Sequence, residues 1–195
     1  MSISSSSLWR KHILPLTLLV GLLAILTLAG DYFLHRLNLV WVGRYLGIPG
    51  TLLIIGSLIY SLRKRKFITA GNPKNYLNMH ELAAWLGSLL VLIHAGVHFY
   101  AILPWLATVA MGINVISGMV GKMLLQRSRE HVQAQRDHFQ LRGLSGPEVE
   151  QAVFWDSVTF AAMTQWRRVH IPIFSVFAVL ALGHVISVFL FWGWQ

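Results

Sequence analysis

The sequence predicts an all-α membrane protein, a polytopic bundle of about five transmembrane helices that forms a single membrane domain over residues 1–195. Hydrophobic residues make up 55% of the chain and charged residues 12%, which is too apolar for a soluble domain of this size. The apolar residues also fall in long runs without Lys, Arg, Asp or Glu, and one bilayer crossing needs about 20 apolar residues. The basic residues collect on one side of the predicted membrane, as the positive-inside rule requires.

The first two helices are predicted at about residues 13–34 and 40–62, because residues 13–30 and 45–62 carry no charged side chain. The basic residues before the first run resemble the start of a signal peptide. The run is longer than a signal-peptide core, however, and no small-residue cleavage site follows it. We therefore expect the first helix to be retained as a membrane span.

The third and fourth helices share one long apolar segment. Residues 82–121 form a run of forty residues without a charged side chain, which is long enough for two crossings. Pro104 is the natural position for a turn within this run, because proline interrupts a helix. We therefore predict a third helix at about 78–102 and a fourth at about 104–125.

The last uncharged run, residues 171–195, predicts a fifth helix at about 168–192. A long polar segment at about 127–167 separates it from the fourth helix and is expected to be a cytoplasmic loop. Within this loop, Ser145 followed by Glu148 forms a capping-box pattern, which predicts the start of a short helix. No soluble domain of ordinary size fits between the predicted spans.

The positions of the 16 Lys and Arg residues predict the topology. Two precede the first helix, five lie between the second and third helices, and seven lie from Lys122 to Arg168. Only Arg36 and Arg44 fall on the opposite side. The positive-inside rule therefore predicts a cytoplasmic N-terminus and an outer C-terminus in the inner (cytoplasmic) membrane. The same distribution accounts for the net charge of +9 without a nucleic-acid partner.

The absence of cysteine excludes several redox sites. Disulfides, cysteine-ligated iron–sulfur clusters and the CxxCH attachment of covalent haem all need that residue. The sequence also contains no GxGxxG or GxxxxGK pattern, so nothing in it predicts a nucleotide-binding domain. Any flavin or nicotinamide chemistry is therefore expected on another protein.

Four histidines in the predicted third and fifth helices share one spacing. His80 and His94 are fourteen residues apart, and so are His170 and His184. Fourteen residues come within about 40° of four full helical turns, so both side chains of each pair share one helix face, about 21 Å apart. A lone histidine in a membrane helix usually only bonds a neighbouring helix. Two matched pairs indicate a functional site instead.

The topology places these histidines at matching depths, because one helix separates the third from the fifth and both run in the same direction. Neutral imidazoles on opposite faces of one iron are the ligands of a bis-histidine haem b. The sequence thus predicts two haem b groups between these helices. The inner haem would bind His80 and His170, and the outer haem would bind His94 and His184. His98, four residues after His94, is an alternative outer ligand.

Four further residues are predicted near the haems. Gly87 lies midway between the two histidines of its helix, on the same face, and would leave room for a flat ring. Phe177 holds the corresponding position in the fifth helix, where ordinary packing would also explain it. Arg44 and Lys122 border apolar spans and are candidate partners for haem propionates. For most other basic residues near the span ends, a role in topology or contact with the head groups is the stronger explanation.

The two histidine pairs, the aromatic residue between the second pair and the stretch "IIGSLIYSLRKRK…NMHELAAWLGSLLVLIHAGVHF" resemble the ferric reductase-like transmembrane domain. This superfamily includes the NADPH oxidases, the ferric reductases and the haem subunit of bacterial methionine sulfoxide reductase systems. The resemblance covers about residues 45–192 and implies a dihaem b-type cytochrome. Glu81 departs from the pattern, because the family usually has arginine after its first ligand. The segment at 127–167 is also long, and the flavin and nicotinamide module that many members carry is not seen.

The sequence therefore predicts a dihaem b-type cytochrome that carries electrons across the membrane, as a subunit of a redox complex without its own flavin or nicotinamide site. The electron donor would be a cytoplasmic-side protein or a quinol, and the acceptor would lie on the outer side. The segment at 127–167 is the expected docking surface for a redox partner protein.

Two alternative functions are consistent with the sequence. A quinol-reactive anchor subunit of a respiratory oxidoreductase would bind quinone near one haem, with Trp, Tyr and His98 near the outer face as candidates. A histidine-lined metal or proton transporter is the weaker alternative, because metal sites usually add carboxylates or thiols to histidine. In this chain Glu81 and Asp31 lie at the ends of predicted helices.

Overall fold

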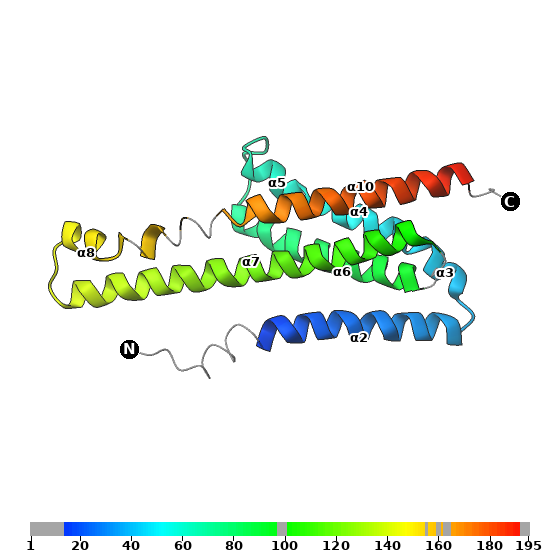
Figure 1. The fold of residues 1–195 in the computed structure, drawn as a ribbon, viewed down its shortest axis with the longest axis horizontal. Helices are drawn as coiled ribbons and strands as arrows, with labels where there is room; N and C mark the ends of the chain where they lie inside the picture. The colour runs from blue at the N-terminus through cyan, green and yellow to red at the C-terminus, as the bar shows by residue number, and fades with distance from the viewer. Residues whose placement is uncertain (1–13, 97–100, 155, 159–160, 162–164, 192–195) are drawn as a thin grey trace.

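The computed structural model describes residues 14–96, 101–154, 156–158, 161 and 165–191, which form helices and their connections, with no strand among them. Within these ranges, five helical spans are long and apolar enough to cross a membrane. They are Leu14–Arg36, Val40–Lys64, Pro73–Gly96, Ile102–Leu141 and Arg168–Phe191. The predicted fold class, an all-α multi-pass membrane bundle, is confirmed (Figure 1).

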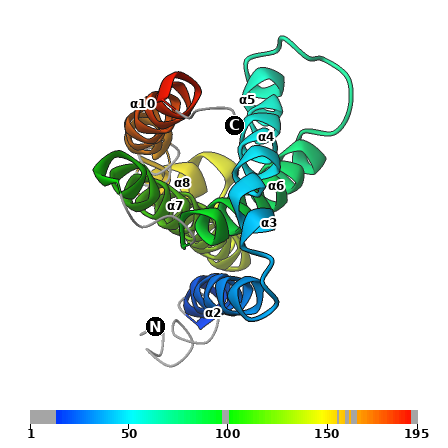
Figure 2. The same ribbon diagram turned by 90° about the vertical axis from the view of Figure 1, so that its right-hand side faces the viewer.

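Helix α2 (Leu14–Arg36) lies at the edge of the bundle, as Figure 2 shows. It packs mainly on α6 (Pro73–Gly96). Most of its large apolar side chains are exposed, which is the pattern of a helix that faces lipid on several sides. Gly30 makes the contact with α6 close, because a Cβ at this position would lie 2.7 Å from Cδ1 of Ile93. This helix therefore joins the bundle along one narrow seam.

The second span is divided into α3 (Val40–Tyr45), α4 (Gly47–Ser57) and α5 (Ile59–Lys64). The interruptions fall at Leu46 and Leu58, which both keep right-handed helical dihedral angles. The chain therefore continues in the same direction through both points, with locally tightened turns. Pro49 lies in the first turn of α4, where its missing N–H favours the start of a new helix over the continuation of α3.

Helix α6 begins at Pro73, five residues before the predicted start. The side chain of Asn72 accepts a hydrogen bond from the N–H of Lys74 at 2.9 Å, and proline is favoured in a first helical turn. The helix packs closely on α4 through two glycines. A Cβ on Gly50 would lie 2.9 Å from the carbonyl oxygen of Gly87, and one on Gly87 would lie 2.8 Å from that of Gly50.

Helix α7 (Ile102–Leu141) has 40 residues and is about 60 Å long. The sequence predicted a helix only to about residue 125 and a loop from 127, and this boundary is wrong. The polar residues beyond 125 change the environment of the chain from lipid to water, but no glycine or proline stops the helix before Gly143, whose φ is +81°. The end of α7 consequently projects beyond the other spans (Figure 1).

Helix α8 (Gly146–Ala152) begins with the predicted capping box, which is confirmed. Hydrogen bonds from the side chain and backbone N–H of Ser145 hold the pKa of Glu148 below its ordinary value. Val149 and Val153 are buried where α8 lies against α7. Residues 128–154 and 156–158 therefore form a helical hairpin, the α7–α8 hairpin, where the sequence predicted a loop that contains one short helix.

Helix α10 (Arg167–Phe191) completes the bundle and packs on α7. The apolar core lies at the centre of the bundle, where Met111 is 1% and Phe177 8% exposed. Partly buried residues of α4 and α6 pack against this cluster. Side chains of α4, α6, α7 and α10 therefore pack together midway between the two ends of the histidine-bearing helices.

Candidate functional site

The histidines of α6 and α10 lie in two pairs. The ring centres of His94 and His184 are 6.4 Å apart, with the ring planes inclined at 50°. His80 and His170 each lie fourteen residues before these two histidines on the same helices, so they lie toward the other end of the bundle. All four imidazoles are half-buried. Because fourteen residues of α-helix span about 21 Å, the two pairs lie near opposite ends of the bundle.

Hydrogen bonds to the second span determine which ring nitrogen carries the proton in the two α6 histidines. Nδ1 of His80 lies 3.0 Å from the carbonyl oxygen of Ser57, and Nδ1 of His94 lies 3.1 Å from that of Gly43. A carbonyl oxygen can only accept a hydrogen bond, so each Nδ1 must carry the proton and donate it. In the neutral ring the lone pair is then on Nε2, which leaves that atom able to bind a metal.

The carbonyl group of Ser57 is available because the second span is interrupted beside it. In a continuous α-helix each carbonyl accepts from the N–H four residues later. Here the N–H of Ser61 bonds to the carbonyl oxygen of Leu58 at 2.8 Å, three residues earlier. The carbonyl of Ser57 meets the imidazole of His80 instead. A local tightening of one membrane span thus supplies an acceptor to a histidine on another.

The first interruption serves His94 in a similar way. The N–H of Leu46 bonds to the carbonyl oxygen of Gly43 in a three-residue turn, and this oxygen also accepts from His94. Gly47, directly after the interruption, gives the imidazole its space, because a Cβ there would lie 2.9 Å from Cδ2 of His94. The ring therefore packs directly against the backbone of the second span.

Gly87 lies at the contact between α6 and α4. Besides the carbonyl oxygen of Gly50, a Cβ on Gly87 would meet Cγ1 of Ile54 at 2.8 Å. Close approach of the two helices therefore requires a glycine here, and this reason is independent of the space for a flat ring that the sequence predicts. The contact of Gly87 with a cofactor stays a prediction.

His170 is held by α7. Its Nδ1 lies 3.3 Å from Oγ of Ser117. One turn earlier, directly before α10, Trp166 donates its Nε1–H to the backbone oxygen of the same serine at 2.9 Å. A Cβ on Gly118 would touch Cε1 of His170 at 3.4 Å, and one on Gly121 would overlap the indole of Trp166. The sequence "SGMVG", from Ser117 to Gly121, therefore provides the surface on which the rings of Trp166 and His170 pack.

Phe177 is buried in the apolar core with Ala110 and Met111 of α7. Its position midway between His170 and His184 places it between the levels of the two histidine pairs, as the sequence spacing indicates. Core packing accounts for the residue, and any contact with a haem stays a prediction.

The predicted charged residues lie at the ends of the site. Lys122 of α7 forms an ion pair with Glu81, the residue that follows His80. Arg44 follows Gly43, whose carbonyl holds His94, and its side chain is exposed. His98, the alternative outer ligand, lies outside the described residues.

Sequence reasoning did not find Gly43, Ser57 and Ser117, which hold three of the four imidazoles. A signal for the first interruption was present in the "GIPG" of residues 47–50, because glycine and proline together mark a break in a helix. No local pattern marks the two serines. Their contacts depend on which helices become neighbours, and a single helix does not contain that information.

The residues present fit bis-histidine haem ligation. Two imidazoles bound to opposite sides of one iron, each about 2 Å from the metal, have ring centres about 6 Å apart. The 6.4 Å separation of His94 and His184 agrees with this arrangement. Metal-bound histidines also usually donate their second N–H to a carbonyl or carboxylate, as His80 and His94 do. Across the described ranges, no group of three or more His, Asp or Glu residues converges as a metal site.

Comparisons with protein-family models, curated proteins and solved structures found no match to this chain. The geometry of the histidine pairs is therefore the basis on which a function is assigned.

Proposed function

We propose that the protein is a dihaem b-type cytochrome that carries electrons across a membrane. The observation that carries this proposal is the hydrogen bonding of His80 and His94 to backbone carbonyls. Carbonyl groups hold their Nδ1 protons, so the lone pair that can bind a metal is on Nε2, and α10 carries histidines at the same spacing, with His184 opposite His94. Haem b bound between two neutral imidazoles supplies one-electron transfer. The resemblance of the sequence to the ferric reductase-like domain agrees with this assignment.

The proposed ligand sets join α6 to α10 at each end of the bundle. The inner haem is assigned to His80 and His170, and the outer haem to His94 and His184. The carbonyl groups of the second span orient the α6 rings, and Ser117 contacts the inner α10 ring. A protein tunes a bound metal by fixing the orientation of the ligand rings and by hydrogen bonds to the ring nitrogen that does not bind the metal.

Residues around the ligands would shape the surroundings of the haems. The buried cluster at Phe177 excludes water from the centre of the bundle, which keeps the local dielectric low. Lys122 and Arg44 lie near the two ends of the histidine pairs, where a cation would offset the charge of a propionate. The ion pair between Lys122 and Glu81 reduces the net charge available at the inner end.

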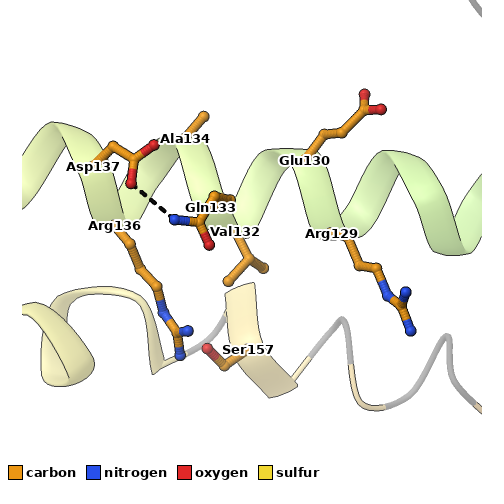
Figure 3. A pocket seen from close by; sticks show the side chains of 8 residues that line it. All are labelled: Arg129, Glu130, Val132, Gln133, Ala134, Arg136, Asp137 and Ser157. Atoms are coloured by element: carbon orange, nitrogen blue, oxygen red, sulfur yellow. Dashed lines mark hydrogen bonds between the residues drawn. The ribbon is translucent and has the colours of Figure 1, made fainter.

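The α7–α8 hairpin is the proposed docking surface for a redox partner protein. A hollow of about 700 Å³ opens between α7 and the segment that holds Ser157, and Figure 3 shows Arg129 and Arg136 extending from α7 toward that segment. The lining residues are Arg129, Glu130, Val132, Gln133, Ala134, Arg136, Asp137 and Ser157. With the orientation that the basic residues predict, in an inner membrane, the hairpin lies in the cytoplasm. The electron donor would then be a cytoplasmic protein that carries its own flavin or nicotinamide site.

Haem content tests the proposed function. The purified full-length protein should contain two haem b per chain by pyridine haemochrome spectroscopy. Single His→Ala changes should each remove one haem, at His80, His170, His94 and His184. His138→Ala is the matched control, because this exposed histidine of α7 lies away from both pairs and should leave the haem content unchanged.

Two results would contradict the proposal. One is full pigment in well-folded His80→Ala and His170→Ala variants. The other is a colourless wild-type protein that binds zinc, which would indicate the histidine-lined transporter.

A quinol-reactive anchor subunit is a second candidate function, favoured by two residues near the end of α2. Oδ1 of Asp31 is buried without a hydrogen-bond partner among the described residues and lies 3.5 Å from Nδ1 of His35. Gly96, two residues after His94, packs against this carboxylate. A carboxylate and an imidazole near the outer pair could accept the protons that a quinol releases. Quinol oxidation by the isolated protein that Asp31→Asn abolishes, with both haems retained, would favour this function.

A further inference from the structure

His170 differs from the two α6 histidines in the group that holds it. His80 and His94 donate to backbone carbonyls, whereas Nδ1 of His170 meets the side-chain hydroxyl of Ser117. A hydroxyl can donate or accept, so this contact alone leaves the protonation of His170 open. Ligation decides it, because an imidazole that binds a metal through Nε2 carries its proton on Nδ1, and the hydroxyl must then accept.

We propose that Ser117 is a positioning residue that accepts the Nδ1 proton of His170 and thereby sets the redox potential at the His80–His170 pair. This inference rests on the proposed function, because it assigns a role within the same site. A hydrogen bond from Nδ1–H makes an imidazole a more basic ligand. A more basic ligand favours the oxidised state of the metal, so the bond lowers the potential.

The surroundings of Ser117 support a specific role for its hydroxyl. The residue is 7% exposed, so water does not compete for the contact with His170. The bond from Trp166 ends on the backbone oxygen of Ser117 and not on its side chain. Removal of the hydroxyl therefore deletes one interaction of His170 and keeps the anchor that holds α10 against α7.

A redox titration of the full-length protein and its Ser117→Ala variant tests the inference. The variant should raise one of the two midpoint potentials and leave the other, together with the haem content, unchanged. The expected rise corresponds to about a tenfold change in the redox equilibrium constant, which is about 59 mV for one electron.

Ser88→Ala is the matched comparison. Ser88 of α6 is also buried, at 2% exposed, but the hydrogen bonds that hold His80, His94 and His170 end on other residues. Ser88→Ala should therefore leave both potentials unchanged. Ser117→Thr, which keeps the hydroxyl, should return the potential to the wild-type value. If Ser117→Ala binds less haem, Ser117→Thr should recover it, and a loss in both variants would overturn the inference.

The failure of this inference and the failure of the proposed function give different results. If Ser117→Ala binds two haems with unchanged potentials, Ser117 has no such role and the proposed function stands. If the wild-type protein binds no haem, both are overturned. A shift of the same size in Ser88→Ala would also overturn the role of Ser117, because it would show that any buried serine in these spans affects the potential.

Discussion

The ring nitrogen that carries the proton determines what a buried neutral imidazole can bind. In His80 and His94 that proton lies on Nδ1, because its partners are carbonyl oxygens at 3.0 and 3.1 Å. These bonds also satisfy N–H groups that would otherwise be buried without an acceptor, at a cost of about 1–3 kcal/mol each. The same contacts therefore contribute to the stability of the bundle and put the lone pair on Nε2, where the proposed function needs it.

Gly47→Ala is expected to displace the imidazole of His94. The new Cβ would lie 2.9 Å from Cδ2 and 3.1 Å from Nε2 of that ring, so the ring must shift. The outer haem should be lost and the inner one kept, so the haem content should fall from two per chain to one. Gly56→Ala is the control in the same helix, because a Cβ there meets nothing within 4 Å. Equal haem content in the two variants would show that Gly47 does not provide space for His94.

The spacing of single residues allowed the histidine pairs to be predicted, but not the groups that hold them. Helix periodicity alone places His80 with His94, and His170 with His184, on one face each. The acceptors lie on other helices, and Ser117 reaches His170 across 53 positions in the chain. Such a contact is fixed by the packing of α7 on α10, which sequence periodicity does not encode.

At the level of helices, a close backbone contact joins α4 and α6 through Gly50 and Gly87. Small residues allow membrane helices to approach until their backbones touch, and packing then replaces the hydrophobic effect as the source of association. This contact places the interrupted span beside the histidine face of α6. The positions of the carbonyl acceptors consequently depend on two residues that have no side chain.

Gly87→Ala is expected to separate α4 from α6, because the new methyl group would lie 2.8 Å from the carbonyl oxygen of Gly50. The free energy of unfolding should fall by about 1–3 kcal/mol, the usual cost of overpacking a close contact. Thermal unfolding in detergent measures the change. Gly112→Ala in α7 is the control, because its Cβ would meet nothing within 4 Å. A stable Gly87→Ala protein that loses haem would instead favour the predicted role of Gly87 beside a flat ring.

Hydropathy predicted the five spans because each must match the thickness of a bilayer. It did not predict where helices end in water, since polarity and helicity are separate properties. The stretch from Lys122 to Leu141 is polar yet helical, and the stop came from Gly143 with its positive φ. The break at "GIPG" was missed because residues 45–62 carry no charged side chain and therefore read as one continuous span.

On the scale of the whole molecule, the α7–α8 hairpin is a separate part of the core. Val132, Val149 and Val153 are buried in it, away from the cluster at Met111 and Phe177. An ion pair between Arg136 and Glu150 at 3.0 Å closes its exposed side. The hairpin and the membrane bundle therefore have their own apolar contacts, and α7 is the helix that they share.

Val153→Asp is expected to open the hairpin and leave the bundle intact. The valine is 0% exposed, and an unpaired carboxylate at such a position costs several kcal/mol. Proteolysis between residues 141 and 158 should become faster, and the haem content should stay at the wild-type value. Gln151→Asp, at an exposed position of α8, should change neither. Loss of haem in Val153→Asp would show that the two parts are not independent.

One continuous helix, α7, runs from the α7–α8 hairpin into the interior of the bundle. In α7, the hairpin residue Val132 and the histidine partner Ser117 are fifteen residues apart, which is about 22 Å of uninterrupted helix. A protein that tilts or rotates the hairpin would therefore move the hydroxyl beside His170 with it. By reciprocity, a change in the electronic state at His170 would alter the affinity for that protein. Binding of a partner and electron transfer would then be coupled through one helix.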